Sequence, residues 1–145
     1  MAVDVRTEVL IARRREEVAA FASDPDNAPR WYVNIDEVRW RTAPPLRVGT
    51  RLDFVARFLG RRLAYTYEVR ELLPGERLVM STADGPFPME TTYTWSSPEE
   101  GTTLMTLRNR GRPARAFGVL TPLMARAVRG ANRKDLANLR RILES

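Results

Sequence analysis

Between Val3 and Arg110 the chain alternates apolar and polar residues, and only one stretch, residues 14–32, interrupts that alternation. Alternation with a period of two is typical of strands that bury one face. From about residue 113 to 144 the apolar residues return at helical spacing. The chain therefore predicts one strand, a short helical insert, six more strands and a long closing helix. Few folds have this order of elements.

The insert itself predicts two short helices. Residues 13–23 carry apolar side chains at helical spacing and are rich in Ala and Glu. Asp24 is then expected to cap a second helix, with Pro25 at its first position and its end near Trp31.

The six later strands are separated by turn residues about every ten positions, which predicts an antiparallel meander. The turns are expected at residues 43–45, 60–62, 73–76, 84–86 and 97–101. The sequence leaves open which face of the last strand points inward, because Leu104 on one side and Met105 with Leu107 on the other both fit.

The closing helix is expected to carry a kink. Pro122 removes one backbone hydrogen bond and crowds the carbonyl group four residues earlier. We therefore favour a kinked helix over residues 113–144. The alternative is a helix that begins with Thr121 as its N-cap and Pro122 at its first position.

Composition limits the chemistry. The 145 residues predict a single domain over residues 1–145, with 43% apolar and 29% charged residues. Cysteine and histidine are both absent, which argues against thiol or imidazole catalysis, and we expect neither a metal nor a cofactor. The sequence has no apolar run of membrane-spanning length and no signal peptide, so stable membrane insertion is not expected and a cytoplasmic location is.

The net charge of +6 does not predict nucleic-acid binding. Nearly all the positive charge is arginine, scattered among acidic residues, and no nucleic-acid motif or aromatic interleaving accompanies it. One local cluster, at Arg108, Arg110, Arg112 and Arg115, is interpreted as surface charge. Asp53, Glu68 and Glu90 are expected to be solvated on the outer face of the sheet.

The order of elements resembles the helix-grip fold of the START/Bet v 1-like (SRPBCC) superfamily, often labelled polyketide cyclase/dehydrase-like. The local similarities are residues 15–21 (REEVAAF), 24–31 (DPDNAPRW), 67–78 (YEVRELLPGERL) and 133–144 (RKDLANLRRILE). The resemblance implies an α+β fold in which a curved, seven-stranded antiparallel sheet surrounds the C-terminal helix. It also implies an apolar cavity between the two, but no single activity.

Twelve apolar or aromatic residues are candidates for the wall of that cavity, because they share the expected inner face of the strands or helix, or lie near the implied opening. They are Trp31, Phe54, Phe58, Tyr65, Tyr67, Met80, Met89, Tyr93, Trp95, Phe117, Leu120 and Met124. Tyr65, Tyr93 and Arg110 are the candidate catalytic residues, since phenol and guanidinium groups can orient enol or carbonyl oxygens.

Three functions remain open at this stage. The first is binding of a small hydrophobic molecule, lipid-like or polyketide-like. The second is an enzyme of the cyclase, aromatase or dehydratase type that works in the same cavity without a metal, His or Cys. The third is an interaction module with a filled core, for which a homodimer is one form of assembly.

Overall fold

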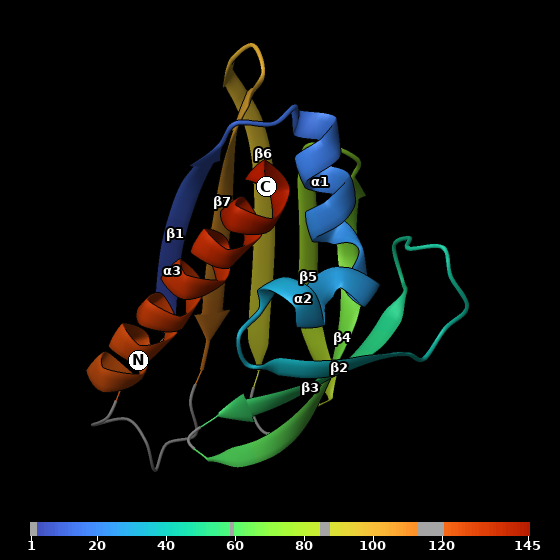
Figure 1. Ribbon diagram of the computed structural model, residues 1–145. Coiled ribbons are helices and arrows are strands. Elements are labelled where there is room, and N and C mark those ends of the chain that lie inside the picture. The colour runs from blue at the N-terminus through green and yellow to red at the C-terminus, as the bar shows by residue number, and fades with distance from the viewer. Residues whose placement is uncertain (1–2, 59, 85–87, 113–120) are drawn as a thin grey trace.

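The computed structural model describes residues 3–58, 60–84, 88–112 and 121–145 (Figure 1). The elements follow the predicted order: β1 (Val3–Ile11), α1 (Arg15–Ser23), the 3₁₀ helix η1 (Pro25–Asn27), α2 (Ala28–Trp31), β2 (Ile35–Trp40), β3 (Arg51–Phe58), β4 (Arg61–Leu73), β5 (Arg77–Asp84), β6 (Met89–Glu99), β7 (Thr102–Gly111) and α3 (Thr121–Glu144).

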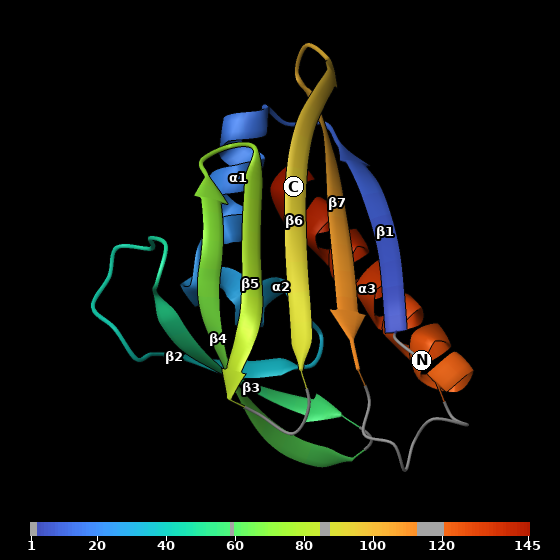
Figure 2. The ribbon, with the colours of Figure 1, turned by 180° about the vertical axis from the view of Figure 1, so that it is seen from behind.

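All seven strands belong to one antiparallel sheet in the order β1-β7-β6-β5-β4-β3-β2. β1 therefore forms one edge of the sheet, paired with β7, and β2 forms the opposite edge. In the described part of the chain, α1, α2 and α3 all lie on one face of the sheet (Figure 1), and no described helix lies on the other face (Figure 2). The predicted α+β helix-grip architecture is confirmed.

The insert begins as predicted and differs in its detail. Asp24 accepts a hydrogen bond from the backbone N–H of Asp26 at 3.0 Å, and Pro25 opens the next helical segment. That segment is not one helix, however, because it starts as the 3₁₀ turn η1 and only then becomes α2. The side chain of Trp31, at the end of α2, is fully buried.

The last two strands are longer than the turn signals predicted. β6 continues through Pro98 to Glu99, which pairs with Thr102, so the turn is confined to Glu100 and Gly101. Gly101 has a φ of 77°, a conformation that favours glycine. The inner face of β7 is now assigned: Met105 and Leu107 point inward and are fully buried.

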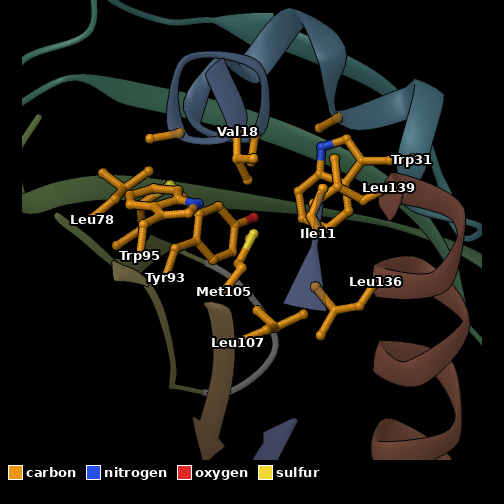
Figure 3. Packing of buried hydrophobic residues seen from close by; sticks show 14 of the residues in the cluster. Ile11, Val18, Trp31, Leu78, Tyr93, Trp95, Met105, Leu107, Leu136 and Leu139 are labelled. Atoms are coloured by element: carbon orange, nitrogen blue, oxygen red, sulfur yellow. The ribbon is translucent and has the colours of Figure 1, made fainter. Parts of the chain in front are cut away.

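The core lies at the end of the sheet that α1 and α2 cover. Figure 3 shows side chains from β1, α1, α2, β5, β6, β7 and α3 meeting there. Its largest fully buried members include Trp31, Ile11, Leu78, Met105, Leu107, Leu136 and Leu139. Burial of each aliphatic side chain of this size contributes about 1.5–3 kcal/mol.

The closing helix packs against β1 and α2. Leu136 and Leu139, in its C-terminal half, are part of the core. The described helix begins at Thr121, with Pro122 as its second residue. The part of the kinked-helix prediction that concerns residues 113–120 lies outside the described residues.

Candidate functional site

A cavity of about 220 Å³ lies between the N-terminal half of α3 and the curved sheet. The helix contributes Met124, Val128 and Ala131 to its wall. These residues are spaced by four and three positions, which places them on one face of the helix. On the opposite side, each of the seven described strands contributes to the wall, from Val3 on β1 to Ile35 on β2.

Six of the residues expected on the cavity wall do line it: Phe54, Tyr65, Tyr67, Met80, Met89 and Met124. They come from four neighbouring strands and from α3. Phe54 and Tyr67, on paired strands, make an edge-to-face contact with ring centroids 5.4 Å apart. Met80, Met89 and Met124 add flexible thioether chains, which adapt to ligands of different shapes.

Three aromatic residues expected on the wall are elsewhere, and that expectation was wrong for them. Trp31 and Trp95 belong to the packed core, and Tyr93 lies behind Tyr32, whose side chain reaches the cavity instead. Tyr93 contacts the rings of both tryptophans, with centroids 5.8 and 6.0 Å away. The reason is that α1 and α2 cover this end of the sheet (Figure 1), and their side chains Val18, Ala22 and Ala28 belong to the same packed core.

Three further candidates cannot be placed. Phe117 and Leu120 lie outside the described residues, and so does the side chain of Phe58. The backbone of Phe58 forms the last position of β3, paired with Arg61.

The cavity has a polar region on α3 that the sequence patterns did not predict. Asn132 and Asp135 line the cavity and are only 4% and 3% exposed. One carboxylate oxygen of Asp135 accepts a hydrogen bond from the backbone N–H of Val33 at 2.9 Å. Burial raises the pKa of Asp135 to about 6, and the Val33 hydrogen bond opposes that rise.

Tyrosine hydroxyl groups lie beside this polar region. The hydroxyls of Tyr32 and Tyr93 form a hydrogen bond of 2.5 Å. Burial raises the pKa of both well above the usual value of 10, and it raises the pKa of Tyr67 to about 12. All three phenols are therefore protonated at neutral pH and can donate hydrogen bonds.

The strand end of the cavity is polar as well, but its groups already have partners. The Thr91 hydroxyl donates to Asn109 Oδ1 at 2.7 Å. Arg110 reaches the cavity rim and forms an ion pair with Glu90 at 3.6 Å, although both side chains remain substantially exposed.

The charged residues of the outer face are mostly paired rather than freely solvated. Arg108 holds Asp4 through two hydrogen bonds of 2.8 and 2.6 Å. Arg115, expected in the same surface cluster, lies outside the described residues. Asp53 and Glu68 were expected to be solvated, yet their side chains are only 16% and 18% exposed because arginines cover them. Within the described part of the chain, no group of three or more acidic residues is placed to hold a metal ion.

A signal for the missed residues was present. Asn132 and Asp135 follow Val128 by four and seven positions, so helical periodicity places them on the apolar stripe. Two polar residues at buried positions of a stripe indicate either a defect or a site. Tyr32 carried no comparable signal, because it lies in the link between α2 and β2, outside any periodic pattern.

Comparison with known proteins gives one family and many similar folds. Residues 2–144 match the family described as polyketide cyclase / dehydrase and lipid transport. A comparison with curated proteins finds no match. Among the described residues, no helix is long and apolar enough to cross a membrane.

Three solved structures illustrate the similarity in fold. TTHA0849 from Thermus thermophilus is 20% identical, with a TM-score of 0.82 over 95% of this chain and 94% of that one. A START superfamily protein from Mycobacterium smegmatis is 15% identical, with a TM-score of 0.82 over 97% of both chains. The Zhui aromatase/cyclase from Streptomyces sp. R1128 is 14% identical, with a TM-score of 0.82 over 99% of this chain and 94% of that one.

Proposed function

Since the chain belongs to the polyketide cyclase / dehydrase and lipid transport family, we propose that it binds a small, mainly apolar molecule between its sheet and α3. The observation that carries the proposal is the cavity of about 220 Å³ with its largely apolar wall. An engineered apolar cavity of about 150 Å³ in another protein admits benzene, so this volume suffices for a larger molecule.

The chemistry of the wall supports this function. Phe54, Met80 and Met124 offer apolar surface from the sheet and from the helix. Transfer of apolar ligand surface out of water contributes about 25 cal/mol for each Å² that is buried. Pockets for small molecules commonly combine such a wall with a few polar groups that orient the ligand.

The experiment is to fill the cavity. Ala131 lies on the cavity wall in α3, and Ala131→Phe places a ring in the space. Ala137→Phe introduces the same ring at an exposed position of the same helix and is the matched control. Binding of 2-methylnaphthalene, an uncharged apolar probe, is measured by isothermal titration calorimetry, and native mass spectrometry of freshly purified protein detects any co-purified small molecule.

We expect the wild type and Ala137→Phe to bind the probe and Ala131→Phe to bind it at least tenfold more weakly. Wild-type protein that binds no apolar probe would contradict the proposal. Equal binding by Ala131→Phe and Ala137→Phe would contradict the location of the site.

A second candidate function, dehydratase- or cyclase-type catalysis, is favoured by one observation. Asp135 presents a carboxyl group on the cavity wall, and burial brings its pKa to about 6. A group with such a pKa can accept and return a proton near neutral pH. In a β-hydroxy ketone, Asp135 would remove the proton next to the carbonyl group and return it to the departing hydroxyl group, which leaves as water.

This candidate is tested with a β-hydroxy ketone, by following the ultraviolet absorbance of the conjugated enone that water loss produces. Catalysis predicts turnover by the wild type and none by Asp135→Asn, while both still bind 2-methylnaphthalene. Equal rates for the wild type, the variant and buffer alone would exclude it for this substrate.

A further inference from the structure

The polar region of α3 contains two side chains whose hydrogen-bonding capacity is not fully used by the protein. Asn132 Nδ2 is buried and has no hydrogen-bond partner among the described residues. Asp135 directs one oxygen to the Val33 N–H, and the described part of the chain supplies no hydrogen-bond donor to the other oxygen. Both side chains line the cavity.

Burial without a partner needs an explanation. An unpaired amide or carboxylate in an apolar environment lowers stability, so buried polar groups in folded proteins are nearly always hydrogen-bonded. The tyrosines do not supply these partners in this structure, because the hydroxyls of Tyr32 and Tyr93 are hydrogen-bonded to each other and form no hydrogen bond with Asn132 or Asp135. A group that enters the cavity is therefore the natural partner for both.

The two side chains have complementary chemistry. They are three positions apart on one helix, so they lie on the same face one turn apart. Asn132 Nδ2 is a donor, and the second oxygen of Asp135 is an acceptor. A hydroxyl group satisfies both, because its oxygen accepts one hydrogen bond while its hydrogen is donated in another.

We propose that Asn132 and Asp135 form a subsite for the hydroxyl group of an otherwise apolar, uncharged ligand, an alcohol or a phenol. This inference rests on the proposed binding function and names the class of ligand. A carboxylate is disfavoured at the same place, since it meets the negative charge of Asp135 in a site of low dielectric constant.

The experiment compares three probes of matched shape that differ in one group: 2-naphthol, 2-methylnaphthalene and 2-naphthoate. Dissociation constants are measured by calorimetry at pH 8, where Asp135 is ionised and 2-naphthol is neutral. The variants are Asn132→Leu and Asp135→Asn. Asn138→Leu is the control, because Asn138 lies on the same helix but donates to the backbone carbonyls of Arg30 and Trp31, outside the cavity.

For the wild type we expect 2-naphthol to bind at least as tightly as 2-methylnaphthalene. Without the subsite, the hydroxyl would be buried unpaired, and 2-naphthol would bind more weakly than 2-methylnaphthalene. Asn132→Leu should reduce the preference for 2-naphthol about tenfold, the effect of one hydrogen bond to a buried group. Asp135→Asn should strengthen 2-naphthoate binding about tenfold, because it replaces a repelling charge by an amide. Asn138→Leu should leave the order of the three probes unchanged.

The result that overturns the inference is specific. If 2-methylnaphthalene binds but 2-naphthol binds more weakly in the wild type, and Asn132→Leu does not alter their ratio, the subsite is refuted while the apolar binding function stands. If none of the three probes binds, both the subsite and the proposed function are refuted.

Discussion

Replacement of Asp135 by Asn should make the folded protein more stable at pH 8. Burial raises the pKa of the Asp135 carboxyl from 3.8 to about 6. The folded state therefore holds the proton more tightly than the unfolded state, so this group stabilises the fold fully below about pH 3.8. That contribution is lost as the pH rises through about 6. At about 1.4 kcal/mol per pH unit, the difference corresponds to about 3 kcal/mol.

Asn has the same shape as Asp and remains uncharged at every pH. Its side-chain oxygen can still accept the Val33 N–H that Asp135 now accepts at 2.9 Å. The variant should therefore be about 3 kcal/mol more stable than the wild type at pH 8, and this gain should fall below about 1 kcal/mol at pH 4. Urea unfolding of both proteins at a series of pH values gives the difference directly, because the titration of all other carboxyl groups cancels.

Asp36→Asn is the control for a change from Asp to Asn as such. Asp36 forms a surface ion pair with Arg57 at 3.1 Å, so its loss should lower stability by less than about 1 kcal/mol. The reasoning about Asp135 is refuted if Asp135→Asn is no more stable than the wild type at pH 8. A gain that stays constant from pH 4 to pH 8 would also refute it, since the cause would then not be the buried charge.

Three further predictions concern the fold and the tyrosines. Trp31→Ala should lower the free energy of unfolding by about 3–5 kcal/mol in urea titrations, because Trp31 is fully buried; a loss below about 1 kcal/mol would contradict its place in the core. Gly75→Ala should cost about 1–2 kcal/mol, since Gly75 has a φ of 78° at the β4–β5 turn; equal stability would argue against that backbone conformation. The wild type and Tyr67→Phe should show the same ultraviolet tyrosine titration from pH 9 to pH 11, because burial raises the pKa of Tyr67 to about 12. A smaller absorbance change in the variant over this range would show that Tyr67 is not shielded from water.

The element order was predictable because it depends on local sequence patterns. Period-two alternation and turn residues mark the strands, and Asp24 with Pro25 marks the start of the second short helical segment. The extension of β6 to Glu99 was not predictable, since Pro98 normally ends a strand and only pairing with β7 carries this one past it. The inner face of β7 needed the sheet register, which places Met105 opposite both Val9 and Trp95.

The candidate site was predicted only in part, and the reason is geometric. Parity along a strand tells which side chains point inward, as it did for Tyr65 and Met80. It does not tell whether a helix covers that inward position. Coverage distinguishes Trp95, which is part of the packed core, from Met89, which lines the cavity. Tyr32 belongs to no periodic pattern and could not be found from one.

The sequence alone determined the α+β class, the order of the elements and, for β1 and β3 to β6, which side chains face the concave side, because each depends on neighbours along the chain. Only the tertiary structure decided where α3 lies on the sheet, and with it which inward residues pack together and which surround an open space. The same packing buries the polar residues Asn132 and Asp135 and leaves them without full hydrogen bonding. Burial is a property of residues that are distant in sequence, and for that reason local patterns do not contain it.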